Sequence, residues 1–252
     1  MKKIKMILTI LVSFVSISVF AQDMPADAAK EYNEGNKLLK AGNFDGAVKH
    51  YQEALKTSKD YRIYYQLGVT LRKQNKLSAA EDAFNESIKS NPNFDAAYNG
   101  LGGTYFQDGK YLDAIESFKK FEQLATKKQH KDQAKEYIAR SYVRLGEAVK
   151  KDGNFNKAIE HFNEALKNHP LDAAYVLLAS TLYENGDYDK SIEASENVLN
   201  LKSSNLKGAA HYYKGMALKQ KQEISKAKES FELAKRDAQY KRLAEYELNL
   251  LN

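Results

Sequence analysis

The sequence predicts an all-α protein, a solenoid of about six helix-turn-helix repeats followed by a C-terminal capping helix. Three observations predict it: turn signals recur along the chain, small residues recur between them, and apolar residues follow helical spacing. The turns begin at residues that lie 33, 34, 44, 33 and 36 positions apart, namely Gly42, Asn75, Gly109, Gly153, Gly186 and Gln222. Recurrence at a period of about 20–50 residues is typical of a stacked repeat array.

Residues 1–21 are predicted to precede the repeats as a cleaved signal peptide. Three lysines lie within the first five residues, residues 6–20 carry no charge, and Val19-Phe20-Ala21 resembles a cleavage site. The alternative is an uncleaved membrane anchor, but this uncharged run is shorter than the roughly 20 residues that a spanning helix needs. We therefore expect export, to the periplasm or outside the cell, with no stable membrane insertion after cleavage.

Composition narrows the classes of function. The chain has no cysteine, which excludes disulfides, thiolate metal sites and a cysteine nucleophile. The net charge is +6 for the full chain, and without residues 1–21 the balance is 36 basic against 33 acidic residues. A surplus this small and this interspersed does not favour binding to nucleic acid.

Each repeat is predicted to form two amphipathic helices joined by a tight turn. In residues 95–128, Tyr98, Leu101 and Tyr105 lie on one helical face, and Gly109 ends that helix. Polar side chains in the first turn of the second helix are expected to cap it. These residues are Asp45, Ser78, Asn156, Asp189 and Ser225.

Small and aromatic residues recur at matching places in the repeats. The small residues of the first helices are Gly35, Gly68, Gly102, Gly146, Ala179 and Gly215. Because glycine costs about 1 kcal/mol within a helix, we expect the partner helix to cross there and leave no room for a side chain. The aromatic residues expected to wedge against the next repeat are Tyr51, Phe84, Phe118, Phe162 and Phe231. Ser195 occupies this place in the fifth repeat, whose junction is therefore expected to be the loosest.

The order of these positions resembles the tetratricopeptide repeat (TPR). The third unit carries the pattern as Tyr98, Leu101-Gly102, Tyr105, Gly109-Lys110-Tyr111, Ala114 and Phe118. The resemblance covers nearly all of residues 22–252, which we interpret as one TPR domain of an exported bacterial protein. It places the units at about 28–61, 62–94, 95–128, 139–171, 172–205 and 208–241. Residues 129–138 are an insertion that lengthens the first helix of the fourth unit, from about Lys131 to Lys151, and residues 238–251 form the capping helix.

The sequence predicts neither catalysis nor a bound metal or cofactor. The five histidines lack the spacing of metal ligands. The glycine-rich residues 100–103 lie inside a predicted helix rather than after a strand, so they fail the context of a phosphate-binding loop. We therefore expect a protein that is not an enzyme.

The TPR resemblance implies that the first helices line a concave face that binds another protein or a peptide. The family's groove positions fall on Tyr32, Asn36, Tyr65, Arg72, Asn99, Phe106, Arg140, Arg144, Tyr183 and Tyr212. Tyrosine and arginine suit peptide recognition through aromatic contact and guanidinium–carboxylate pairs. The family's clamp for a terminal carboxylate is absent from the first three units, where only Asn36 matches. Arg140 and Arg144, four residues apart, are the strongest candidates for contact with an anion.

The favoured function is a non-catalytic adaptor or scaffold of the bacterial cell envelope, which binds a peptide or protein segment in its concave groove. Two alternatives stay open. One is a glycan- or peptidoglycan-binding accessory subunit of an envelope enzyme complex, with exposed tyrosines as sugar platforms. The other is a self-assembling structural protein.

Overall fold

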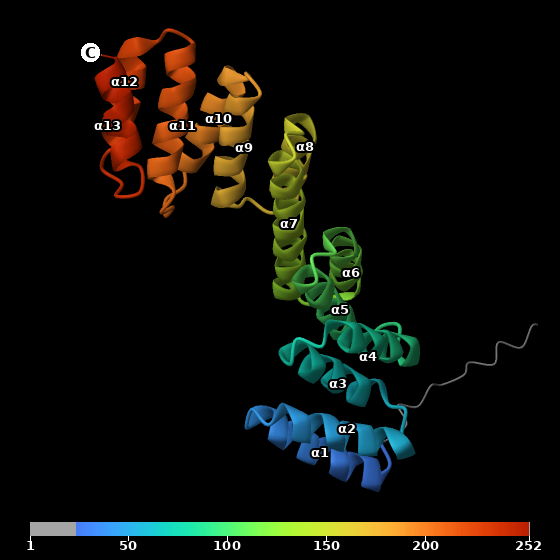
Figure 1. Cartoon of the computed structure of the whole chain (residues 1–252). Coiled ribbons are helices and arrows are strands. Elements are labelled where there is room, and N and C mark those ends of the chain that lie inside the picture. The colour runs from blue at the N-terminus through green and yellow to red at the C-terminus, as the bar shows by residue number, and fades with distance from the viewer. Residues whose placement is uncertain (1–23, 252) are drawn as a thin grey trace, which may run out of the picture.

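The computed structural model describes residues 24–251, so the signal peptide predicted for residues 1–21 lies outside the described residues. Within that range the regular structure is α-helical (Figure 1). The helices are α1 (Ala26–Lys40), α2 (Phe44–Thr57), α3 (Tyr61–Lys73), α4 (Leu77–Ser90), α5 (Asp95–Gln107), α6 (Tyr111–Leu124), α7 (Lys128–Lys151), α8 (Phe155–Asn168), α9 (Asp172–Glu184), α10 (Tyr188–Leu199), α11 (Lys207–Gln220), α12 (Ile224–Ala234) and α13 (Lys241–Leu250).

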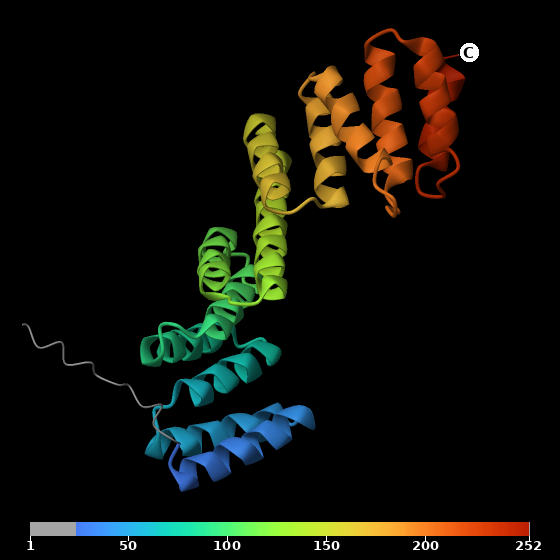
Figure 2. The ribbon, with the colours of Figure 1, turned by 180° about the vertical axis from the view of Figure 1, so that it is seen from behind.

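The helices stack in chain order into an extended array, with α1 and α13 at opposite ends (Figures 1 and 2). Each helix packs mainly on its neighbours in the chain, and α1 also contacts α3, α3 contacts α5, and α9 contacts both α7 and α11. The predicted fold class, an all-α solenoid, is confirmed. Helix α7 begins at Lys128, three residues before the predicted start, and includes residues 129–138.

The predicted turn residues adopt the conformation that a tight helix-to-helix turn requires. The backbone φ angle is positive at Gly42, Gly109, Gly153 and Gly186, and also at Asn75 and Gln222. Glycine enters this left-handed region without steric cost, whereas asparagine does so less readily and glutamine less readily still. The turns of the second and sixth helix pairs, at Asn75 and Gln222, therefore carry the most backbone strain.

The midway glycines make room for an aromatic ring of the same helix pair. A Cβ atom added at Gly68 would lie 2.9 Å from the ring of Phe84, which is fully buried. A Cβ atom at Gly100, on the next pair, would lie 2.4 Å from the same ring. Phe84 thus wedges between α3 and α5 as predicted, but the space at the glycines is filled by the ring and not by the backbone of a crossing helix.

The junction at Ser195 is closed, contrary to the prediction that it is the loosest. Ala179 stands where the other pairs have glycine, and it is fully buried. The buried hydroxyl of Ser195 donates to the carbonyl of Ser191 at 2.8 Å. Tyr213 of α11 packs against the cluster that contains Ala179 and Ala194, so the following repeat supplies an aromatic ring from the other side.

The polar residues expected to cap the second helices mostly connect neighbouring repeats instead. Asp45 accepts a hydrogen bond from the Gln74 side chain at 2.8 Å, and Asp189 pairs with Lys221. The caps that form lie two residues earlier, where Asn43 accepts from the Gly46 amide at 3.0 Å. The prediction of the cap position was wrong because the second helices begin earlier than their polar first turns suggested.

The last helix covers the end of the core but leaves an apolar stripe on its outer side. Ala244 and Leu248 of α13 pack against the core around Phe231. On the opposite side, the exposed fractions of Leu243, Tyr246 and Leu250 are 48%, 62% and 56%. A terminal repeat normally presents a polar outer surface, so this cap is less polar than we expected.

Candidate binding site

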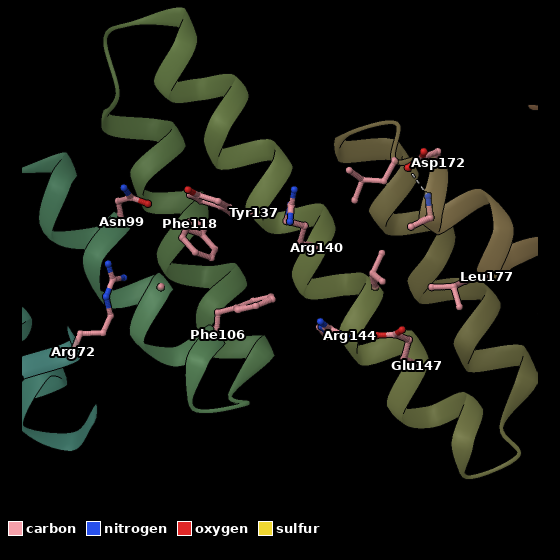
Figure 3. A pocket seen from close by; sticks show the side chains of 14 residues that line it. Arg72, Asn99, Phe106, Phe118, Tyr137, Arg140, Arg144, Glu147, Asp172 and Leu177 are labelled. Carbon is pink, nitrogen blue, oxygen red and sulfur yellow. Dashed lines mark hydrogen bonds and ion pairs between the residues drawn. The ribbon is translucent and has the colours of Figure 1, made fainter. Parts of the chain in front are cut away.

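A cavity of about 590 Å³ lies in the middle of the array, between α3, α5, α7 and α9 (Figure 3). Apart from Phe118 on α6 and Leu171 just before α9, its lining comes from the first helices of the pairs. The lining residues are Arg72, Asn99, Gly103, Phe106, Phe118, Tyr137, Arg140, Val143, Arg144, Glu147, Leu171, Asp172, Ala173 and Leu177.

Half of the groove residues inferred from the sequence meet at this cavity. Arg72 comes from α3, Asn99 and Phe106 from α5, and Arg140 and Arg144 from α7. Figure 3 shows both arginines on α7, between α5 and α9. Their spacing of four residues, about one helical turn, puts them on one face.

Three predicted groove residues of the first two pairs, Tyr32, Asn36 and Tyr65, pack within the chain. Asn36 accepts a hydrogen bond at 2.8 Å from the hydroxyl of buried Tyr51. The ring centroid of Tyr32 lies 6.1 Å from that of Tyr51. Tyr65 packs edge-on to Phe94, with 5.2 Å between ring centroids. These contacts give the three residues a role in stability.

The two predicted tyrosines of the C-terminal half lie outside the cavity lining. The hydroxyl of Tyr183 accepts a hydrogen bond from Gln220 at 3.5 Å. Tyr212 packs against Phe231 and Tyr240, with ring centroids 6.0 and 5.5 Å apart, and burial raises the pKa of its hydroxyl. The structure therefore does not bring the ten predicted residues together into one groove.

The two arginines of α7 already have carboxylate partners. Arg140 donates to Glu136 Oε1 through Nε at 2.9 Å and Nη2 at 2.7 Å. Arg144 donates from Nη1 to Glu147 Oε2 at 2.9 Å. The arginine side chains are 57% and 54% exposed, so each pair contributes at most about 1 kcal/mol to stability. A ligand carboxylate can replace these partners at low cost, but it gains little net charge attraction by doing so.

Arg72 differs from the arginines of α7. Its Nη1 lies 3.4 Å from the carbonyl oxygen of Gly100, and the guanidinium lies over Gly103, where an added Cβ atom would come within 2.1 Å of Nη1. Within residues 24–251 it forms no ion pair. Its positive charge therefore faces the cavity without a neutralising carboxylate.

Aromatic and aliphatic side chains form the apolar part of the lining. The rings of Phe118 and Tyr137 lie 5.0 Å apart, and the Tyr137 hydroxyl is held by Gln133 at 2.9 Å. Phe106, Val143 and Leu177 add further apolar surface. The lining therefore combines apolar side chains with charged and polar ones.

Several lining residues were not among those predicted from the sequence. Tyr137, Val143 and Glu147 lie three or seven residues from Arg140 on α7, so helical spacing from that arginine would have found them. Asp172 and Leu177 depend on how α9 approaches α7, which no local pattern encodes. Asp172 is occupied by a hydrogen bond from Ser204 at 2.9 Å.

The described part of the chain provides little else for chemistry. Across residues 24–251, no three or more His, Asp or Glu side chains gather in a way that would hold a metal ion. Over the same range, no helix combines the length and apolar character that crossing a membrane would take.

Comparison with known proteins identifies the family. Two family models, both described as tetratricopeptide repeat, match residues 94–170 and residues 32–93 together with 143–200. The matches run without a gap from residue 32 to residue 200, well over half of the chain. The chain therefore belongs to the tetratricopeptide repeat family, whose members generally act as non-catalytic adaptors between proteins.

Individual relatives are distant. The chain is 26% identical over 208 residues to the TPR repeat-containing protein MJ1428 of Methanocaldococcus jannaschii, covering 66% of this chain and 37% of that protein. It is 28% identical over 155 residues to heat shock protein STI1 of Saccharomyces cerevisiae, covering 61% of this chain and 20% of that one. The chain thus spans about two fifths or less of the length of these relatives.

Solved structures share the fold. MamA (residues 41 to the end) from Desulfovibrio magneticus RS-1 matches with a TM-score of 0.50 and 21% identity, covering 71% of this chain and 97% of that one. YrrB, described as a TPR protein with an unusual peptide-binding site, matches with a TM-score of 0.51 and 18% identity, covering 78% and 96%. At these identities the likeness concerns the fold alone.

Proposed function

We propose that this protein is an adaptor that holds an extended segment of another protein in the cavity between α3, α5, α7 and α9. The proposal rests mainly on one observation: the first helices of four successive pairs all contribute residues to the lining of one cavity. An extended chain of several residues can contact all four pairs at once. The peptide-binding site described for YrrB supports the same use of the fold.

The proposed place of work is the bacterial cell envelope. The charge and apolar pattern of residues 1–21 supports export, and the lack of cysteine suits a protein that folds in an oxidising compartment. Fractionation of cells that produce the tagged full chain tests this directly. Recovery in the periplasmic or extracellular fraction, with the N-terminus at Gln22, is the expected result, and recovery of the intact chain in the cytoplasm would refute it.

Peptide selection tests the binding proposal. Purified protein is screened against a random decapeptide library, and selected peptides are measured again with a Phe106→Ala variant. Phe106 is half-buried at the cavity and also packs against the core cluster around Phe118, so circular dichroism checks that the variant is folded. A matched variant, Leu112→Ala on α6, removes a side chain that is 63% exposed and lies outside the lining. Loss of binding with Phe106→Ala but not with Leu112→Ala is expected, and a library without ligands would refute the proposal.

Self-assembly is a second candidate, favoured by the outer side of α13. Leu243, Tyr246 and Leu250 follow the three- and four-residue spacing of a helix–helix seam. Light scattering on the purified protein, compared with a Leu243→Ser/Tyr246→Ser variant, decides it. A wild-type mass above one chain that falls to one chain in the variant would favour self-assembly. A single-chain mass for both would remove it.

A further inference from the structure

We infer that Arg72 is the anchor of the cavity and selects an acidic side chain flanked by apolar residues in the bound segment. The inference rests on the proposed peptide-binding function and makes it more specific. It also differs from the expectation drawn from the sequence, in which Arg140 and Arg144 supply the contact with an anion.

The arginines of the lining differ in the charge of their neighbours. Three arginines line the cavity, and two of them share their charge with Glu136 and Glu147 at 2.7–2.9 Å. A ligand carboxylate near either one also meets the carboxylate that is already there. Arg72 has no such neighbour within the described residues, so an approaching carboxylate gains the full attraction of its guanidinium. Charge-assisted hydrogen bonds of this kind are about twice as strong as neutral ones.

Arg72 is also held at the cavity wall. Arg72 is half-buried rather than exposed, and its guanidinium rests against Gly103 on the neighbouring pair. The absence of a side chain at Gly103 lets the guanidinium lie at the cavity wall. The contact with the Gly100 carbonyl is long, at 3.4 Å, and uses one nitrogen, so other donors of the planar group stay available to a ligand. Partial burial also reduces screening by solvent and salt.

The cavity that contains Arg72 also offers apolar surface. Phe106, Val143 and Leu177 line the same cavity and are apolar. A segment that places a carboxylate at Arg72 therefore has apolar surface available for its neighbouring side chains. Asn99, on the same helix as Gly103, can bond the backbone of the segment. Together these groups favour a glutamate or aspartate next to an aliphatic or aromatic residue.

The test uses fluorescein-labelled decapeptides selected from the random library, with every acidic residue replaced in turn by its amide. Binding is measured by fluorescence anisotropy for the wild type, Arg72→Gln, Arg72→Lys and the double variant Arg140→Gln/Arg144→Gln. Circular dichroism checks that each variant is folded. Gln and Lys keep part of the methylene stem of the arginine but lack the guanidinium, whose Nη1 atom makes the contact with Gly103.

We expect one acidic residue of the selected peptides to matter, with its amide weakening binding roughly tenfold or more. Arg72→Gln should weaken binding of the acidic peptide by a similar factor, so that the acidic peptide and its amide bind equally. Arg72→Lys should retain part of the preference for the acidic peptide. The double variant should keep the difference. If Arg72→Gln leaves the preference intact, or the double variant abolishes it, or no selected peptide depends on an acidic residue, the inference is wrong while peptide binding stands. If the library yields no ligand, the proposed function fails as well.

Discussion

Two glycines of α5, three residues apart, should respond to alanine with opposite signs. Both lie inside the helix, where replacing glycine by alanine gains about 1 kcal/mol of helix propensity. At Gly100 the new Cβ atom would lie 2.4 Å from Cε1 of Phe84, a ring that is fully buried and held on its other side by Gly68. At Gly103 the nearest atom is Nη1 of Arg72, the end of a flexible side chain.

The expected change in stability depends on whether the atoms next to the new Cβ atom can move away. The Phe84 ring has no free space, so overpacking at Gly100 costs about 3 kcal/mol, which leaves Gly100→Ala roughly 2 kcal/mol less stable. The Arg72 guanidinium can swing into the cavity, so Gly103→Ala keeps most of its gain and is roughly 0.5–1 kcal/mol more stable. In a chain of this size, about 2–4 °C of melting temperature corresponds to each kcal/mol.

Thermal and urea unfolding, followed by circular dichroism, measure both variants. Gly100→Ala should melt about 4–8 °C below the wild type, and Gly103→Ala at or slightly above it. A Phe84→Leu background supplies the control, because a smaller side chain leaves space and should remove most of the cost of Gly100→Ala. Two results would refute the Phe84 ring as the source of tight packing between repeats. One is an equal change in stability for the two glycine variants, and the other is an unchanged loss of stability for Gly100→Ala in the Phe84→Leu background.

Two further predictions concern charged groups. Lys150 bridges α7 and α9 through Ser180 at 2.8 Å and Glu184 at 2.9 Å with 20% of its side chain exposed, so Lys150→Met should lower the unfolding free energy by about 1–2 kcal/mol. The matched control is Lys37→Met, which removes an ion pair whose lysine is 75% exposed, and it should lower the unfolding free energy by under about 0.5 kcal/mol in the same urea titration. Equal losses of stability in the two variants would contradict a stabilising role for the Lys150 contacts. Burial, with Lys214, Lys207 and Arg236 nearby, lowers the pKa of His211 below 6.5. As the pH falls, this histidine is therefore protonated in the unfolded chain before it is protonated in the folded protein. The free energy of unfolding is highest above about pH 6.5 and decreases as the pH is lowered. His211→Phe should therefore melt increasingly above the wild type as the pH is lowered from about 7.5 to 5.5, and a constant difference would argue against it.

The repeat architecture was predictable because its signals are local. A turn that needs positive φ favours glycine or asparagine, and Gly42 and Asn75 mark such turns in the sequence itself. The group that occupies the space beside the midway glycines was harder to predict. At Gly68 this group is the ring of Phe84, and its position depends on the rotamer of that side chain. The closed junction at Ser195 depends on Tyr213, a residue of the next repeat that no pattern within the fifth repeat includes.

The candidate site was predictable in part. The family positions located Arg72, Phe106 and the two arginines of α7, since these lie on first helices facing the hollow side. The same rule also selected Asn36, whose side chain is bonded to the Tyr51 hydroxyl. Position on a helix determines which way a side chain faces, but not whether a neighbour in the same chain already bonds to it. That second question requires the tertiary contacts.

NMR of methyl-labelled protein, titrated with the tightest peptide from the library, tests peptide binding in the cavity most directly. Val143 and Leu177 line the cavity, whereas Leu112 and Leu250 are exposed elsewhere on the chain. We expect the methyl signals of Val143 and Leu177 to shift as the peptide saturates the protein, while those of Leu112 and Leu250 stay in place. Shifts confined to Leu112 or Leu250, with the cavity methyls unchanged, would contradict it.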